Sequence, residues 1–210
     1  MLVNQIPVLG IILGDHAGSS PEMAAKAVLA AKGCYIPVFT GNLERFQISC
    51  QHVEGAERLQ IRPLEGRPSE GGEDIVYFCD IPAGPDIHFS TVTADSGKLM
   101  YDSMVKMIEL ERAGIVDGFS MAPITKAGFH AAGLPYNSEF ELFADLYGVA
   151  NVSSVVKCEN VFRSTVVGHC AFRDIVDRLT TDGIIRTAHN LLHVMGLFCR
   201  RKNAGSQLPL

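Results

Sequence analysis

The stretch VLGIILGDHAGSSPE, residues 8–22, decides the fold class of this chain. Its first part, residues 8–13, is a near-continuous apolar run, as in a strand that is covered on both faces. A polar, glycine-containing turn follows at residues 14–20. Ser20-Pro21-Glu22 then carries the signals of a helix start, with an N-cap serine, an early proline and an acid in the first turn. The stretch therefore predicts a strand, a loop and a helix in succession.

Strands and helices continue to alternate along the chain. Gly33 is expected to end the first helix, and a second strand is expected over residues 34–40. Further strands are expected at residues 75–79, 116–121, 152–157 and 164–168, and further helices at residues 96–112, 126–132, 139–146 and 181–195. Residues 62–74 are rich in proline and glycine and are expected to be loop. A strand–helix–strand start of this kind predicts an α/β domain.

The composition is that of an ordinary globular protein. The chain has 210 residues, of which 47% are apolar and 20% charged, so the disordered, collagen-like and coiled-coil classes are excluded. The formal net charge is −5 and the only basic run is Arg200-Arg201-Lys202, which argues against a nucleic-acid partner. No apolar stretch reaches the roughly 18–20 residues of a membrane-spanning helix, and residues 6–13 lack the basic flank of a secretory signal. We therefore expect no membrane partner.

The cysteines are dispersed along the chain, at Cys34, Cys50, Cys79, Cys158, Cys170 and Cys199. No two of them form a C-x-x-C pair, so zinc-ribbon and thioredoxin-like sites are without their signature. Dispersed cysteines are typical of reduced, buried side chains, and they favour a cytoplasmic location.

The loop after the first strand, residues 14–22, is the first candidate for a functional site. In α/β folds ligands bind at the carboxyl ends of strands, and the backbone amides of a helix N-terminus favour an anion. The glycines of this region do not have the G-x-G-x-x-G spacing of a dinucleotide fingerprint. Within the loop, His16 is a candidate ligand contact. The alternative interpretation is a well-capped connection that binds nothing.

Residues 122–126, APITK, form the second candidate, because they follow an expected strand. Lys126 could hold a phosphate or a carboxylate as a point charge. The alternative is an exposed surface lysine. The sequence contains no G-x-S-x-G elbow, so a hydrolase based on a serine triad has no support.

Three histidines suggest metal chemistry without defining a site. His169 follows an apolar run, and a histidine at the carboxyl end of a strand suits a metal ligand or a general base. A metal needs three or four donors, so a hydrogen-bonded structural histidine is the alternative. His189 and His193 have a spacing that can bind zinc, but Asn190 stands where the H-E-x-x-H motif has glutamate. The alternative for this pair is an exposed helix surface.

Several segments together resemble the 4-hydroxythreonine-4-phosphate dehydrogenase family (PdxA-like). Residues 14–22, GDHAGSSPE, are similar to the family signature G-D-P-A-G-[IV]-G-P-E, and residues 122–126 to A-P-[IV]-[NS]-K. Residues 132–136, AGLPY, resemble the A-G-x-P-[YF] that follows. His169 with residues 173–180 resembles T-H-x-[PA]-L-R-D-[VI]…L-T. The order and spacing agree from residue 8 to about residue 195, and the motifs are specific in combination.

The resemblance implies a layered α/β fold of the isocitrate/isopropylmalate dehydrogenase type, active as a homodimer. It implies an NAD-dependent oxidation, with decarboxylation in some cases, of a phosphorylated or anionic hydroxy acid like 4-hydroxythreonine 4-phosphate. A divalent metal (Zn, Mg, Mn or Co) would bind the substrate and act as a Lewis acid. By the same resemblance His169 is the first metal ligand, Lys126 and Asp15 belong to the catalytic pocket, and Glu22 lines the first loop.

The chain departs from the family pattern at the substrate pocket. Where the family has G-H-T-E, residues 137–140 read NSEF, so Glu139 replaces the histidine and Phe140 the threonine. These two residues and His16, which replaces a proline of the signature, are the expected substrate contacts. A glutamate at this place would repel the family's usual phosphorylated substrate.

Residues 1–196 are expected to form the N-terminal part of the family fold, and residues 197–210 a disordered tail unlike the family. The family's later segments, N-P-H-A-G-E and H-D-Q-G with further metal-binding histidines and an NAD-binding stretch, are not found in the sequence. The chain is thus expected to be a truncated or divergent member, whose exposed sheet edge and apolar surface favour association. The alternative function is that of a catalytically inactive remnant, acting at most as a binding or interaction protein.

Overall fold

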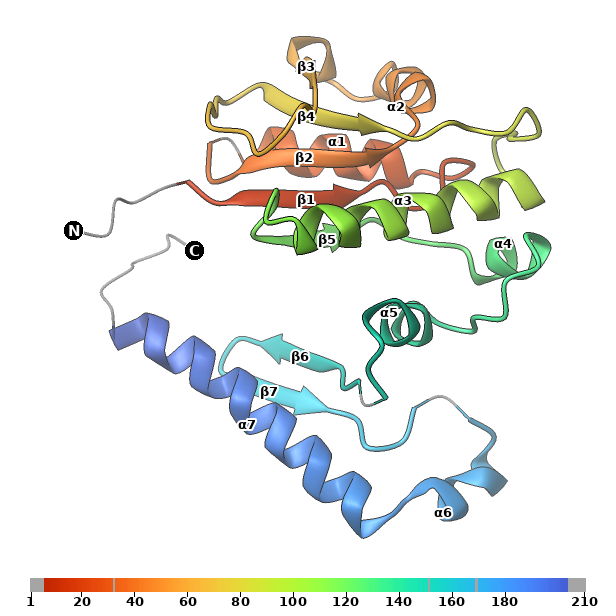
Figure 1. Cartoon of the computed structure of the whole chain (residues 1–210), viewed down its shortest axis with the longest axis vertical. Coiled ribbons are helices and arrows are strands. Elements are labelled where there is room, and N and C mark those ends of the chain that lie inside the picture. Colours follow the sequence, from red (N-terminus) through yellow and green to blue (C-terminus); the bar gives the residue numbers. More distant parts are fainter. Residues whose placement is uncertain (1–5, 32, 151, 169, 204–210) are drawn as a thin grey trace. The chain divides into compact units, whose positions relative to one another are not determined.

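The computed structural model describes residues 6–31, 33–150, 152–168 and 170–203 (Figure 1). The chain divides into two compact units, unit 1 from Met1 to Tyr147 and unit 2 from Gly148 to Leu210. The region expected to form the family fold, residues 1–196, thus comprises unit 1 and most of unit 2. Among the described residues, no helix has both the length and the apolar character needed to cross a membrane.

Unit 1 is built on a five-stranded sheet in which all neighbouring strands are parallel. The order across the sheet is β3-β4-β2-β1-β5. The strands are β1 (Val8–Ile12), β2 (Ile36–Gly41), β3 (Gln60–Pro63), β4 (Ile75–Asp80) and β5 (Gly118–Met121). Strand β1 has β2 as its neighbour on one side and β5 on the other. The strands that follow β1 in the chain are added on the β2 side, and β5 is added on the opposite side, so the strand order reverses between β1 and β5. Open α/β sheets bind ligands at such a switch point, outside the carboxyl ends of the strands.

Helices cover both faces of this sheet. One apolar cluster joins Ile11 and Leu13 to α1 (Ser20–Ala30) and α2 (Leu43–Cys50). A second cluster joins Val8 and Ile12 to helices of the other face, which are α3 (Ala94–Arg112), α4 (Lys126–Ala131) and α5 (Glu139–Tyr147). Successive side chains of a strand point to opposite faces, so the continuous apolar run of β1 serves both clusters.

Two contacts show how tightly the layers pack. Phe39, Phe46 and Phe78 form an aromatic cluster with ring centroids 4.9, 5.5 and 5.9 Å apart. On the other face α3 meets α4 so closely that a Cβ at Gly97 would lie 1.8 Å from the carbonyl oxygen of Gly128. This approach of two backbones requires glycine at position 97.

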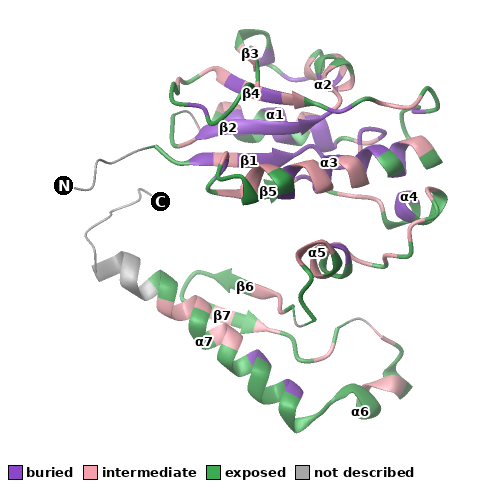
Figure 2. Cartoon of the chain, in the orientation of Figure 1, coloured by how far each residue is buried: buried purple, intermediate pink, exposed green. Residues whose placement is uncertain are grey.

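Unit 2 contains a hairpin and one long helix. β6 (Val155–Cys158) pairs antiparallel with β7 (Val161–Ser164) across a two-residue turn, in which Glu159 has a φ of 49°. The elements that follow are η2 (Phe172–Asp174), α6 (Ile175–Arg178) and α7 (Thr181–Asn203). Helix α7 packs against β7, with the rings of Phe162 and Phe198 5.5 Å apart. Figure 2 shows few buried residues in this unit, whereas the central strands β1 and β2 of unit 1 are almost entirely buried.

The predicted α/β class is confirmed, but several element boundaries differ. The strand predicted at residues 164–168 is wrong, because the hairpin ladder pairs Ser164 with Val155 and ends there. Strand β3 was not predicted, since it is a short edge strand that ends in proline. Helix α7 continues past its expected end at residue 195 to Asn203, so residues 197–203 are helical and not a disordered tail. Residues 204–210 lie outside the described part of the chain.

The described cysteines are free, and they are less buried than expected. Cys34 and Cys158 are exposed, while Cys50, Cys79 and Cys170 are half-buried. Partial burial raises the pKa of the Cys50 thiol to about 11 and also raises the pKa of Cys79. A thiol reacts as its thiolate, so these two side chains are poor nucleophiles.

Candidate active site at the carboxyl edge of the sheet

The two loops that carry the sequence motifs leave the sheet side by side. The first loop, residues 14–19, connects β1 to α1, and the second loop, residues 122–125, connects β5 to α4. Strands β1 and β5 are parallel neighbours, and their last residues, Ile12 and Met121, are paired. The two predicted sites therefore lie together at the switch point of the sheet.

Hydrogen bonds tie the first loop to the second. The Asp15 carboxylate accepts from the Thr125 hydroxyl at Oδ2 and, at 2.9 Å, from the Ala17 amide at Oδ1. The Asp15 amide donates to the Pro123 carbonyl at 3.0 Å, and the Ser20 hydroxyl donates to the same oxygen at 2.7 Å. Both carboxylate oxygens of Asp15 are thus engaged by the chain itself. Asp15 joins the first loop to the second in this structure, and its catalytic role stays a prediction.

Gly14 and Ser20 allow the two loops to meet closely. Gly14 has a φ of 68°, and a Cβ there would lie 2.3 Å from the Pro123 carbonyl oxygen, so glycine is required on both counts. Ser20 was predicted to cap α1, but Ser19 is at the N-cap and Ser20 is the first helical residue. Its hydroxyl contacts the second loop instead. Sequence reasoning missed this contact and the one made by Thr125, because each depends on a partner about 100 residues away.

His16 belongs to the first loop, but its side chain is buried and does not face the solvent. The residue is 1% exposed, its Nδ1 lies 3.0 Å from the Gly14 carbonyl oxygen, and its Nε2 accepts from the Asn42 amide at 3.0 Å. Since Nε2 accepts, Nδ1 carries the proton and donates. Burial is the main cause that lowers the pKa of His16 to about 4, so the ring is neutral at pH 7. The expected ligand contact is therefore corrected: His16 joins the first loop to the residue that caps α2.

Lys126 is exposed at the first position of α4, directly after the second loop. Within the described residues it forms no ion pair. Its ammonium group is thus open to an anion at the carboxyl edge. Glu22, in the first turn of α1, is half-buried.

A third loop, residues 81–93 after β4, completes this edge and was not singled out from the sequence. The Ser90 amide donates to the Ala17 carbonyl at 2.7 Å, and Ser90 takes a left-handed φ of 60°. Ile81 and Ile87 pack with Ala17 and with Leu99 of α3. The third loop is therefore anchored to the first loop by both backbone and apolar contacts.

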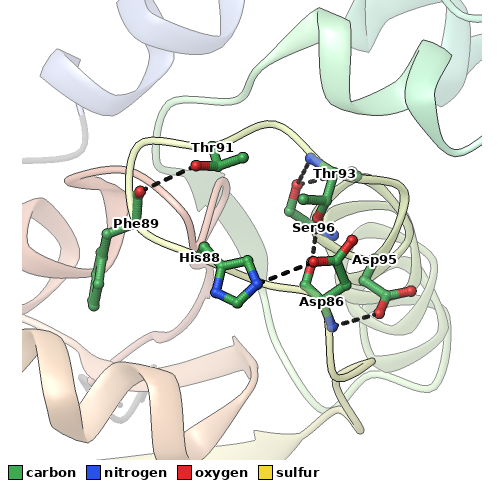
Figure 3. Close-up of polar contacts among 7 residues, drawn as sticks. All are labelled: Asp86, His88, Phe89, Thr91, Thr93, Asp95 and Ser96. Carbon is green, nitrogen blue, oxygen red and sulfur yellow. Dashed lines mark hydrogen bonds and ion pairs between the residues drawn. The ribbon is translucent and has the colours of Figure 1, made fainter.

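The third loop is also ordered from within (Figure 3). The Asp86 amide donates to Asp95 Oδ2 at 2.8 Å, and the Thr93 hydroxyl donates to the Asp86 carbonyl at 2.5 Å. Thr93 and Ser96 form a capping box at the start of α3. The one signal in the sequence was this T-x-x-S pattern before the helix, which predicts a cap but not a functional loop.

Comparison with known proteins identifies the family. Residues 24–203 match the family model described as "Pyridoxal phosphate biosynthetic protein PdxA". The chain belongs to the PdxA family. It is 25% identical over 203 residues to a D-threonate 4-phosphate dehydrogenase of Cupriavidus necator, covering 93% of this chain and 60% of that protein. It is 26% identical over 196 residues to a 4-hydroxythreonine-4-phosphate dehydrogenase of Beijerinckia indica, covering 90% of this chain and 57% of that protein.

A solved structure shows the same fold. A 4-hydroxythreonine-4-phosphate dehydrogenase from Burkholderia phymatum matches with a TM-score of 0.75 and 26% identity, over 89% of this chain and 57% of that chain. The chain thus spans between 57% and 60% of the length of these PdxA relatives. The predicted family and fold class are confirmed.

Glu139 and Phe140, which are predicted to replace a His-Thr pair of the family, lie in the first turn of α5. This turn is held by Glu141, whose amide donates to Ser138 Oγ at 3.2 Å and whose carboxylate accepts from the Asn137 amide at 2.7 Å. Glu139 is half-buried and Phe140 is 42% exposed. Hydrogen bonds among the described residues do not join either side chain to the first loop.

The metal site expected from PdxA resemblance is not formed by the described residues. His169 lies outside them, and His189 and His193 are exposed on α7. Among the described residues, no three His, Cys, Asp or Glu side chains gather as a metal-binding group. The described part of the site therefore offers loop contacts, one free lysine and polar groups, but no ligand set for a cation.

Proposed function

We propose that the chain is a dehydrogenase that oxidises a CH–OH group of a phosphorylated hydroxy acid. The observation that carries this proposal is the junction of the two motif loops at the switch point, made by Asp15, Ser20 and Thr125. The names of the PdxA relatives support the reaction, since they act on D-threonate 4-phosphate and 4-hydroxythreonine 4-phosphate. In the reaction the substrate loses a hydride and a proton and becomes a ketone.

The residues of the edge have distinct parts in this proposal. Lys126, exposed beside the junction, binds the anionic substrate as a point charge. Asp15 and Thr125 hold the two loops at a fixed separation, so the loops lose less conformational entropy when the substrate binds. His16, neutral and buried, holds the base of the first loop.

We propose NAD as the hydride acceptor and a divalent metal (Zn, Mg, Mn or Co) as the second cofactor, with His169 among its ligands. NAD, if bound, would supply the acceptor for the hydride that leaves the substrate carbon. Family membership supports both cofactors. Because the described residues do not form a metal site, we derive no step through the metal.

A second copy of the chain is the partner that we propose for the working enzyme. Unit 2 supports this, because Phe172 and Val176 are 90% and 80% exposed and Leu192 is 63% exposed. Several exposed apolar side chains on one small unit are typical of a surface that another chain covers. Light scattering should then give twice the chain mass, and a monodisperse monomer would contradict the homodimer.

Thermal unfolding with added ligands tests the proposed activity. D-threonate 4-phosphate and NAD should each raise the melting temperature, since a ligand at 100 times its dissociation constant adds about 2.7 kcal/mol to stability. Together they should form NADH, which is followed by its absorbance. Lys126→Ala should abolish the shift caused by the phosphorylated acid and retain the shift caused by NAD.

Two outcomes would change the proposal. A shift without NADH formation would favour the alternative function of an inactive binding protein. If neither ligand shifts the melting temperature and no NADH forms, the dehydrogenase function is wrong for this chain.

A further inference from the structure

The three loops at the carboxyl edge contain few groups that can bind an anionic substrate by charge. Their described side chains that can carry positive charge, with the lysine that follows the second loop, are His16, His88 and Lys126. His16 is buried and neutral, because burial lowers its pKa to about 4. Only His88 and Lys126 remain for this task; His88 lies in the third loop, and Lys126 directly follows the second loop.

His88 lies in a part of the third loop that is anchored to the site. Two residues further on, the Ser90 amide donates to the carbonyl of Ala17 at 2.7 Å. One residue earlier, Ile87 is 1% exposed and packs with Ala17. Because Ala17 is itself bonded to the Asp15 carboxylate at 2.9 Å, His88 is linked by short contacts to the junction of the first and second loops.

The orientation of the His88 ring is set by Asp86. His88 Nε2 lies 3.1 Å from Asp86 Oδ1, and Asp86 is in turn fixed by Thr93 and Asp95 through its backbone. Figure 3 shows the His88 ring turned toward Asp86, while the Phe89 ring points away. The His88 side chain is 66% exposed. Its Nδ1 has no hydrogen-bond partner in the described part of the chain, so the ring has one nitrogen held and one open.

We propose that His88 is a substrate-binding residue whose Nδ1 contacts the phosphate group of the substrate, with Asp86 as the residue that orients it. This inference rests on the proposed function, because it assigns a further contact to the same substrate. Because Asp86 engages Nε2, Nδ1 is the ring nitrogen left to contact a phosphate oxygen. His88 and Lys126 would then bind the phosphate from two loops.

Calorimetric titration of the full chain tests this role, with D-threonate 4-phosphate and inorganic phosphate as probes. His88→Gln should weaken the binding of both probes roughly tenfold, as expected for the loss of one charge-assisted hydrogen bond. Asp86→Asn should weaken them by a smaller factor, because the ring remains but is less well oriented. His52→Gln is the matched control, since His52 is exposed in the turn after α2 and outside the three loops, and it should leave both affinities unchanged. In NMR spectra, phosphate should shift the ring protons of His88 and not those of His52.

The outcomes separate this inference from the proposed function. If the wild-type chain binds D-threonate 4-phosphate and His88→Gln binds it equally well, the role of His88 is wrong while the proposed function stands. Equal weakening by His88→Gln and His52→Gln would show a general charge effect and also overturn the role. If the wild-type chain binds neither probe, the proposed substrate class fails, and the role of His88 fails with it.

Discussion

In unit 1 most of the large apolar side chains are enclosed between a sheet and its helices, whereas many of those in unit 2 face the solvent. Phe39 of β2 is 0% exposed, but Phe172 of unit 2 is 90% exposed. The parallel sheet has helices on both faces, while the hairpin of unit 2 has α7 as its packing partner among the described elements. Unit 1 thus has closed apolar cores of its own, whereas the exposed apolar side chains of unit 2 form the surface that we propose a second copy covers.

The largest expected effect compares the same substitution in the two units. Phe39→Ala should lower the free energy of unfolding by about 3–5 kcal/mol, because it leaves a cavity in a closed aromatic cluster. Phe172→Ala, the control, should change it by no more than about 0.5 kcal/mol. Urea unfolding followed by circular dichroism measures both. Equal losses for the two variants would break the comparison.

The second expected effect concerns buried and exposed histidines. The pKa of His16 is about 4 in the folded chain and 6.5 as the ordinary value, so the unfolded chain binds this proton more readily. The stability that His16 contributes is therefore present above about pH 6.5 and is lost as the pH falls toward 4, by up to roughly 3 kcal/mol. Urea unfolding between pH 7 and pH 4 measures this slope.

Substitutions identify the histidine that is responsible for the slope. His16→Gln should flatten the dependence of stability on pH, whereas His189→Gln in unit 2 should not, because His189 is exposed. An unchanged slope in His16→Gln would contradict the assignment.

A third test compares a helical glycine in each unit. Gly97→Ala should destabilise unit 1 by about 1–3 kcal/mol, because the added methyl group meets the carbonyl oxygen of Gly128. A Cβ at Gly196 in α7 would meet no atom within 4 Å, so Gly196→Ala should stabilise the helix by roughly 0.5–1 kcal/mol. The two signs are measured from the midpoints of thermal unfolding, and a stabilising Gly97→Ala would refute the close crossing of α3 and α4.

The smallest expected effect sharpens the account of the site. Thr125→Val removes the hydroxyl that donates to Asp15, and it should lower the free energy of unfolding by about 1–2 kcal/mol. A double-mutant cycle with Asp15→Asn should give a coupling energy of at least about 0.5 kcal/mol, because the two groups interact directly. Additive effects of the two substitutions would mean that Asp15 and Thr125 do not hold the loops together.

The sequence predicted those parts of the fold and the site that depend on local patterns. The run of residues 8–13 predicted a strand covered on both faces, and the loops around Asp15 and Lys126 were found from their places after strands. His16 was misjudged, because burial of a polar side chain depends on the Asn42 amide that it meets in three dimensions. The third loop was missed for the same reason, since its link to the site is a backbone contact from Ser90 to Ala17.

The cysteines have a practical consequence for anyone who labels this protein. Cys34 in unit 1 and Cys158 in unit 2 are exposed, while the raised pKa values of Cys50 and Cys79 slow their reaction with thiol reagents. With Cys170 and Cys199 replaced by serine, maleimide dyes should attach at one native position in each unit. Energy transfer between such dyes would then report how the distance between the two units responds to substrate, with no cysteine introduced.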